Sequence, residues 1–319
     1  MQLVGETLGF PSWYICCGFL VFWAVQYVTN TSVECIVAPF TGDNSATVLS
    51  LSAPGDAILS LGTSTTFLLS IPPSNTAPKR CTTSHLLAHP IESNAQIAML
   101  CYKNGALARE QVRDRHAAGD WAKFSELVEE TPVGNDGYLG LYFPLPEIIP
   151  PGVVGEFFFS CKDALSPGIP TIVGVIPSTA HPRAILESQF LSIRSRISDV
   201  LPEDAHPLRH LVVVGGSSVN QAIMQLAADI LRMRVYVVDG WENKEAACVG
   251  GALLARFVWW RERGIRTFKE LDVRVLEKLK CVAEPRDSHS REYENLLAVY
   301  RACEEVVRIR AQAEAGDLP

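Results

Sequence analysis

The chain has 319 residues, a hydrophobic fraction of 48%, a charged fraction of 20% and a formal net charge of −7. This is the composition of an ordinary globular protein, and the acidic balance argues against a nucleic-acid partner, because phosphate backbones are bound by an excess of Lys and Arg. The nine cysteines include no C-x-x-C pair and no Cys/His spacing that suits zinc. Free thiols in a reducing, cytoplasmic compartment are therefore expected.

The first 32 residues differ in character from the rest of the chain. Residues 13–28 form an uncharged run of 16, which is at the short limit for a membrane-spanning helix of about 20 apolar residues. Glu6 is the only charge before this run, and no small-residue cleavage site follows, so a secretory signal is not indicated. A membrane segment, a buried element and a non-native start all stay open, and membrane attachment is not the favoured interpretation.

From residue 33 onward, short apolar runs alternate with turn residues and then with helical periodicity. The turn at 62–64 separates two β-like runs and predicts a hairpin, and apolar steps of three and four residues predict a helix over 186–201. The predicted strands are 57–61, 67–69, 97–102, 211–214 and 235–238, and the predicted helices also include 104–115, 121–130, 222–232, 245–263 and a closing helix around 293–300. Residues 144–182, rich in proline and glycine, are predicted to be an irregular connection.

Residues 211–263 follow the order strand, glycine turn, helix, strand, helix, which predicts an α/β fold with a largely buried sheet. The chain is accordingly divided into an apolar N-terminal segment (1–32), a main domain (33–265) and a helical tail (266–319).

Two short motifs in the first half of the chain could carry chemistry. The sequence T-G-D-N at residues 41–44 consists of common turn residues and, on spacing alone, predicts a turn. The sequence G-T-S-T-T at residues 62–66 follows an apolar run. Its glycine lets the backbone approach a ligand, and its hydroxyl and N–H groups can bind phosphate oxygens, but an ordinary hairpin has the same composition.

A third motif, V-V-V-G-G-S-S-V-N, occupies residues 212–220. A buried strand ends there in two glycines and the chain then enters a predicted helix, whose N-terminal N–H groups suit an anion or a nucleotide. The motif is neither G-x-G-x-x-G nor a Walker A sequence. By itself it leaves a nucleotide site and a structural turn equally open.

The order and spacing of these motifs, followed by A-A-C-V-G-G-A at residues 246–252, resemble the C-terminal lobe of the FGGY carbohydrate kinases. The resemblance covers roughly residues 33–257, and the stretches 101–110 and 134–143 are most similar to the eukaryotic xylulose kinases of that family. It implies an α/β lobe with the actin-like ATPase (ribonuclease H-like) fold, taken from a two-lobed sugar kinase.

The resemblance also implies ATP-dependent phosphorylation of a sugar, D-xylulose, with ATP and Mg²⁺ as cofactors. Asp43 matches the general base that takes the proton from the attacking sugar hydroxyl, and Asn44 matches a neighbour that touches the sugar. The residues that match ATP-binding positions are Gly62, Thr63, Ser64, Trp121, Gly215, Gly216, Ser217 and Asn220. Trp121 can equally be a core tryptophan, Gly250 and Gly251 match a helix where glycines allow close packing, and no metal ligand is assigned.

The sequence departs from the family at its N-terminus, because family members begin with a lobe that carries a D-x-G-T hairpin, which helps to place Mg²⁺. The residues before 33 do not contain it. We therefore expect an N-terminally truncated form that exposes an apolar patch where a kinase lobe would pack. Three classes of function stay open: a kinase for D-xylulose or for another sugar such as glycerol, gluconate or ribulose, a nucleotide-binding module without catalysis, and a membrane-attached interaction protein.

Overall fold

The structure is a computed structural model that describes residues 40–316 except 54, 73, 75, 77–82, 162–169, 205–207, 240–245, 262, 265–266 and 271–278. The strands are β1 (Ala57–Leu61), β2 (Thr65–Ser70), β3 (His85–Ala88), β4 (Gln96–Tyr102), β5 (Tyr138–Phe143), β6 (Gly155–Ser160), β7 (Thr171–Val173), β8 (His210–Val214), β9 (Arg234–Val238) and β10 (Leu279–Ala283). The α-helices are α3 (Asp43–Leu51), α4 (Gly105–His116), α5 (Trp121–Glu130), α6 (His181–Val200), α7 (Gln221–Leu231), α8 (Ala246–Arg261) and α9 (Asp287–Gly316).

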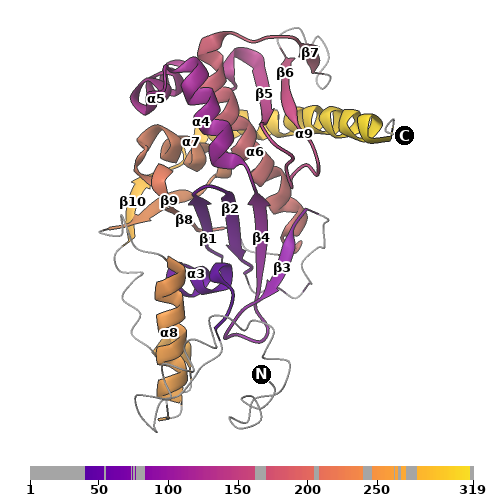
Figure 1. Cartoon of the computed structure of the whole chain (residues 1–319). Coiled ribbons are helices and arrows are strands. Elements are labelled where there is room, and N and C mark those ends of the chain that lie inside the picture. The colour runs from indigo at the N-terminus through magenta and orange to yellow at the C-terminus, as the bar shows by residue number, and fades with distance from the viewer. Residues whose placement is uncertain are drawn as a thin grey trace, which may run out of the picture.

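A mixed seven-stranded sheet with the order β10-β9-β8-β1-β2-β4-β3 forms the centre of the molecule (Figure 1). β1, β8 and β9 run parallel, whereas β2, β4 and β3 are added by antiparallel pairing, as is β10 at the opposite edge. β5, β6 and β7 form a separate antiparallel sheet of three strands. The two sheets, together with the seven α-helices of the described residues, confirm the α/β class.

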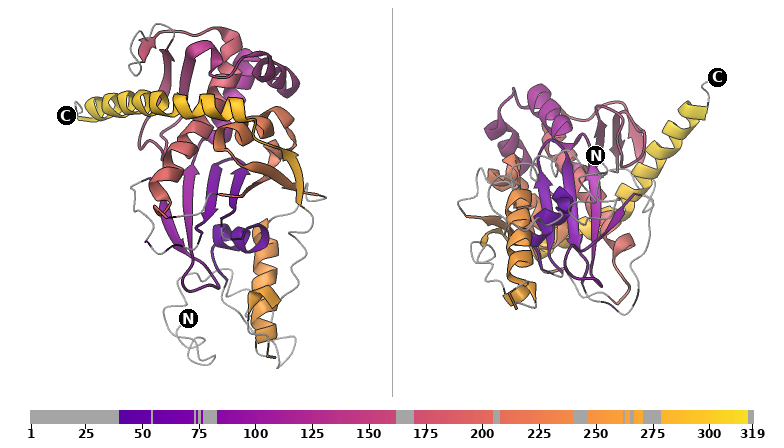
Figure 2. Two further views of the ribbon diagram at one scale, coloured as in Figure 1. Left: turned by 180° about the vertical axis from the view of Figure 1, so that it is seen from behind. Right: turned by 60° about the horizontal axis from the view of Figure 1, so that its bottom comes forward.

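Helices cover both faces of the large sheet, and the side chains of each strand alternate between the two layers. On β1, Ile58 packs with the α3 and α8 side, whereas Leu59 packs with the larger core formed by α4, α5, α6, α7 and α9. This follows from the two-residue side-chain period of a strand. Seen from behind, α9 crosses the back of the molecule over α6 and α7 (Figure 2).

α3 and α8 pack at very short range. A Cβ atom added to Gly250 would lie 1.7 Å from the backbone oxygen of Ala46, and one added to Gly251 would lie 2.7 Å from the Phe40 ring. Glycine is therefore required at residue 250 for the helices to meet, which confirms the packing role expected of this pair of glycines.

Two predicted segments were wrong. Residues 41–44 are no turn: Gly42 is the N-cap of α3 and Asp43 is its first residue, because the following turns of the helix bury Ala46, Val48 and Leu51 completely. Residues 144–182 are not wholly irregular, since they contain β6, β7 and the first residues of α6. β6 is a strand because it pairs along its whole length with β5, and that cross-strand pairing is invisible in its local composition.

The membrane question concerns residues 13–28, which lie outside the described residues. Within the part of the chain that the structure describes, no helix is both long enough and apolar enough to span a bilayer.

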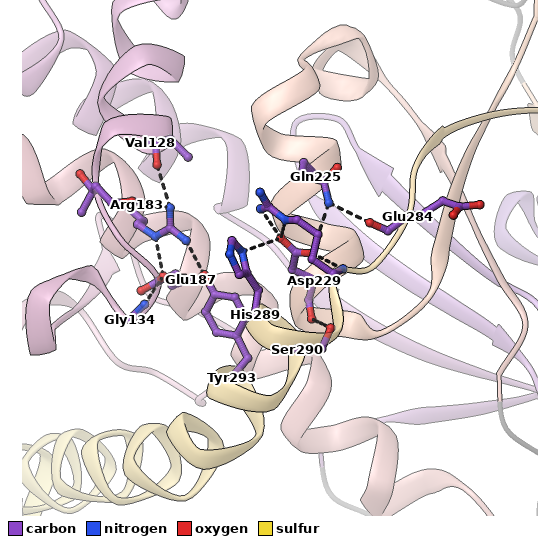
Figure 3. A network of polar contacts seen from close by, with 12 residues as sticks. Val128, Gly134, Arg183, Glu187, Gln225, Asp229, Glu284, His289, Ser290 and Tyr293 are labelled. Carbon is purple, nitrogen blue, oxygen red and sulfur yellow. Dashed lines mark hydrogen bonds and ion pairs between the residues drawn. The ribbon is translucent and has the colours of Figure 1, made fainter.

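A buried ion pair joins α6 to α9 and to the turn after α5 (Figure 3). Arg183 Nε donates to Glu187 Oε1 at 2.7 Å, and its Nη1 donates to the carbonyl oxygens of Val128 and Thr131 at 2.8 and 2.7 Å. Tyr293 of α9 donates to Glu187 Oε1 at 2.7 Å and accepts from Arg183 Nη2 at 2.7 Å. Since charge and hydrogen-bonding capacity are both met inside the network, it fixes α9 without a ligand.

A second polar cluster, also drawn in Figure 3, joins α7 to the start of α9. The fully buried Asp229 accepts from the backbone N–H of Arg286 at 2.8 Å and from its guanidinium Nε at 3.0 Å. Ser290 Oγ donates to the Asp229 carbonyl at 2.9 Å. Like the ion pair on α6, this cluster holds α9 in place, here against α7.

Candidate functional site

The turns after β1 and β8 lie against each other. Because these strands are parallel, their carboxyl ends reach the same edge of the sheet, and the 62–64 turn follows one while Gly215 follows the other. Gly215 has φ +95°, and a Cβ atom there would lie 2.8 Å from the Leu61 carbonyl carbon and oxygen and 3.1 Å from the Gly62 nitrogen. Only glycine allows this approach, so the structure brings two of the sequence-predicted ATP segments together.

Open space remains beside both turns. A Cβ atom on Gly62 would meet its nearest neighbour, the Ser64 carbonyl oxygen, at 3.9 Å, and one on Gly216 would meet nothing within 4 Å. Backbone N–H groups in such a glycine-lined edge can approach phosphate oxygens closely. The residues present therefore fit the phosphate chain of a nucleotide.

The first turn of α4 supports the 62–64 turn from below. The Ala106 N–H donates to the Thr63 carbonyl at 3.3 Å, and a Cβ atom on Gly105 would lie 2.3 Å from Thr65 Oγ1. Thr65 was part of the predicted 62–66 motif, but no supporting role was predicted for Gly105. The signal was the K-N-G sequence at residues 103–105, within a stretch that carried only the family resemblance.

A buried carboxylate anchors this end of α4. Glu147 is 8% exposed and accepts from the backbone N–H groups of Lys103 at 2.6 Å, Asn104 at 2.9 Å and Ile148 at 2.7 Å. N–H groups at the start of a helix have no partner within it and favour negative charge. Glu147, another residue that the sequence analysis missed, thus fixes the helix that holds the 62–64 turn.

The segment after β8 differs in detail from its prediction. A short 3-10 helix, η4 (Gly216–Val219), starts at the second glycine and separates Gly215 from α7. Asn220 is the N-cap of α7: its Oδ1 accepts from the Ile223 N–H at 3.1 Å, and its Nδ2 donates to Ser125 Oγ at 2.8 Å. Since Ser125 Oγ donates to the Trp121 carbonyl at 2.9 Å, the structure brings Asn220 and Trp121 to one place between α5 and α7.

Of the two roles considered for Trp121, the structure shows the packing role. Its half-buried ring packs edge-on against Phe124, with centroids 5.2 Å apart, and the Arg113 guanidinium carbon lies 4.8 Å from the ring centroid. The ring is therefore part of the core packing and of a cation–π contact, and the residue keeps part of its surface exposed.

Asp43 and Asn44 lie at the beginning of α3, which packs against α8. The Asp43 side chain is exposed, and its Oδ1 accepts from the Asn44 N–H at 2.8 Å. Among the described residues, no hydrogen bond connects these two residues to either glycine turn. A carboxylate at a helix N-terminus that is open to solvent can be approached by a sugar hydroxyl.

In the described ranges, no group of three or more His, Cys, Asp or Glu side chains could hold a metal ion. Mg²⁺ in nucleotide sites is commonly bound by one or two carboxylates together with the phosphates, so the residues present suit an ion that arrives with the nucleotide.

The family and its relatives agree with this geometry. Residues 57–259 match the C-terminal domain of the FGGY family of carbohydrate kinases. The chain is 39% identical to "Probable D-xylulose kinase A" of Arthroderma otae over 267 residues. This aligned region covers 75% of this chain and 45% of that protein. It is 33% identical to the xylulose kinase of Mus musculus over 279 residues, 87% of this chain and 47% of that one. The chain thus spans about half the length of the curated relatives it matches.

Solved structures show the same fold. A ligand-bound xylulose kinase of Lactobacillus acidophilus superposes with a TM-score of 0.65 at 14% identity, covering 85% of this chain and 51% of that one. A glycerol kinase of Plasmodium falciparum with ADP gives a TM-score of 0.57 at 15% identity, covering 89% and 52%. The predicted actin-like lobe is confirmed, and the chain belongs to the FGGY family of carbohydrate kinases.

Proposed function

We propose that the protein of this chain transfers the γ-phosphoryl group of ATP to D-xylulose, giving D-xylulose 5-phosphate, in the cytoplasm. The observation that carries the proposal is the contact between the two glycine turns at Gly62 and Gly215, on a chain whose curated relatives are named xylulose kinases. Two adjacent glycine turns at the carboxyl ends of parallel strands are suited to binding one phosphate chain between them.

In this proposal, the 62–64 turn and residues 215–217 hold the phosphates, while Trp121 and Asn220 hold the adenosine. Mg²⁺ bound with ATP supplies charge neutralisation for the transferred group. Asp43 accepts the proton of the sugar hydroxyl, and Asn44 contacts the sugar. Phosphoryl transfer needs mainly positioning and electrostatic stabilisation, together with a carboxylate near the attacking hydroxyl.

We further propose that an N-terminal kinase lobe packs on this chain and contributes the rest of the sugar pocket. The support is the surface of α8, an apolar helix on which Trp259 and Trp260 are 40% and 39% exposed, with Phe40 beside it 58% exposed. Large apolar side chains that a domain leaves exposed on one element can mark an interface. Sequencing of complete transcripts tests this, since an upstream D-x-G-T hairpin joined to this chain is the expected result.

The test of the activity is a phosphoryl-transfer assay with D-xylulose, glycerol and D-ribulose, using the full protein and Asp43→Asn. We expect D-xylulose to be the preferred substrate and the variant to lose about 10²–10⁴-fold in kcat with ATP affinity unchanged, the range for removing a general base. Asp287→Asn is the matched control, because Asp287 is also an exposed aspartate in the first turn of a helix. Preference for glycerol or ribulose would change the sugar but not the reaction.

The second candidate is a nucleotide-binding module without catalysis. Its support is that, among the described residues, no hydrogen bond connects Asp43 or Asn44 to either glycine turn. ATP binding without turnover of any of the three sugars would establish this candidate. Turnover that Asp43→Asn abolishes and Asp287→Asn preserves would exclude it.

A further inference from the structure

Arg109, on α4, is a guanidinium held almost completely out of solvent. The residue is 1% exposed, and its Nη1 donates to Thr65 Oγ1 at 3.0 Å and to Gln189 Oε1 at 2.8 Å. Its Nε and Nη2 atoms have no hydrogen-bond partner among the described residues. The acidic group that acts on it electrostatically is Glu110, its exposed neighbour on the same helix. Arg109 is therefore a buried cation without a buried counter-ion.

Such a charge is costly to remove from water unless it is paired. Burial lowers the pKa of Arg109 to about 10, so the side chain still carries its charge at neutral pH. The two hydrogen bonds that Arg109 donates to neutral oxygens do not balance a full charge. This indicates that the counter-charge comes from outside the described residues.

Arg109 lies next to the 62–64 turn, and this position suggests which group supplies the counter-charge. Thr65 directly follows the 62–64 turn, and Gly105, one helical turn before Arg109, packs on the Thr65 side chain. Gln189 Nε2 donates to the Gly105 carbonyl at 3.0 Å. Arg109, Gln189 and the start of α4 thus support the 62–64 turn, which has open space beside Gly62.

We infer that Arg109 is a positioning residue for the phosphate groups of a nucleotide: it holds Thr65 and so the 62–64 turn, and the bound phosphates balance its charge. The inference rests on the proposed function, which places the phosphates at that turn. Charge interactions persist over several ångströms where water is excluded. The charge of Arg109 should therefore raise the affinity of the 62–64 turn for anions, although the side chain makes no direct contact with them.

The test compares the affinities of ATP and adenosine, measured by calorimetry, for the full chain and for Arg109→Met and Arg109→Lys. We expect Arg109→Met to weaken ATP binding roughly tenfold, the equivalent of about 1.4 kcal/mol, and Arg109→Lys to weaken it less, because the charge is retained. Adenosine affinity should be unchanged in both variants. The thermal midpoint of Arg109→Met without nucleotide should be equal to or above that of the parent, since an unpaired buried charge is replaced by an apolar side chain of similar length.

The matched control is Arg196→Met, because Arg196 is also buried but pairs with Glu304 at 2.9 Å. This control should lose thermal stability and keep the parent ratio of ATP to adenosine affinity. Thr65→Val gives a second route, since it removes the oxygen that Arg109 Nη1 binds and should also weaken ATP but not adenosine binding.

The outcomes are distinguishable. A parent chain that binds neither ATP nor adenosine overturns the proposed function and this inference with it. A parent that binds ATP, with Arg109→Met and Thr65→Val binding it equally well, overturns the inference alone. So does an Arg109→Met variant that fails to fold, or that loses ATP and adenosine affinity to the same extent, because a purely structural role predicts those results.

Discussion

Two buried arginines show how the scaffold of this protein differs from its candidate site. Arg183 on α6 and Arg109 on α4 are 5% and 1% exposed. The guanidinium of Arg183 bonds a carboxylate, two carbonyls and a tyrosine hydroxyl, whereas the Nε and Nη2 of Arg109 have no partner among the described residues. The paired guanidinium of Arg183 stabilises the fold. The guanidinium of Arg109, which lacks such pairing and lies next to the 62–64 turn, is the basis for the inference of a bound ligand.

The largest loss of stability is expected from Arg183→Met, which removes the paired arginine. Removal of one partner leaves the carboxylate of Glu187 buried without its cation, which typically costs about 3–5 kcal/mol. We expect this loss in the free energy of unfolding measured with urea, together with release of α9, because Tyr293 loses a hydrogen bond. Equal destabilisation by Arg109→Met would remove the distinction between the two arginines.

His181 offers a contrast to the two buried arginines, because a buried imidazole can be kept neutral. His181, 6% exposed, stacks on His116 with centroids 3.7 Å apart, and its Nδ1 lies 2.9 Å from the Tyr142 hydroxyl. Burial, with the neighbouring His116, lowers the pKa of His181 to about 4. Unlike Arg109, His181 therefore carries no charge at neutral pH.

The sign of the pH effect follows from that lowered pKa. As the pH falls below 6.5, the ordinary His181 value, the unfolded chain takes up a proton before the folded one, so stability should decline down to about pH 4 and then level off. At about 1.4 kcal/mol per pKa unit, the decline is at most about 3 kcal/mol. Urea unfolding across this range measures it, and His181→Gln should flatten the slope, leaving the smaller part due to His116, whose pKa burial also lowers. An unchanged slope in His181→Gln would contradict the assignment.

The smallest effect on stability is expected on the site side, from Gly215→Ala. A Cβ atom there would lie 2.8 Å from the Leu61 backbone at φ +95°, and a non-glycine residue in such a conformation typically costs about 1–3 kcal/mol. The turns should separate, so ATP binding should weaken more than the stability loss alone would suggest. Gly216→Ala is the control for stability, because a Cβ atom there meets nothing within 4 Å. If both variants unfold at the same urea concentration, the two turns are not in contact.

Most of the elements could be predicted from local sequence. The hairpin of β1 and β2 was predicted from two apolar runs around Gly62, and α6 from its three- and four-residue apolar spacing, since both patterns are local consequences of side-chain period. α3 and the strands β3, β5, β6, β7 and β10 were missed because their stability comes from packing and pairing with other elements, which their own composition does not show. α3 needs α8 against its small residues, and β6 needs β5.

The candidate site divides in the same way. Sequence by itself determined the glycine motifs at residues 62–64 and 215–217 and the family to which they point, because a close backbone approach requires glycine itself. Only the tertiary structure decided that Gly215 touches the Leu61–Gly62 backbone, that Glu147 anchors α4, and that two guanidinium nitrogens of the buried Arg109 have no hydrogen-bond partner among the described residues. Burial and charge balance depend on what surrounds a side chain in space, and a single sequence does not contain those neighbours.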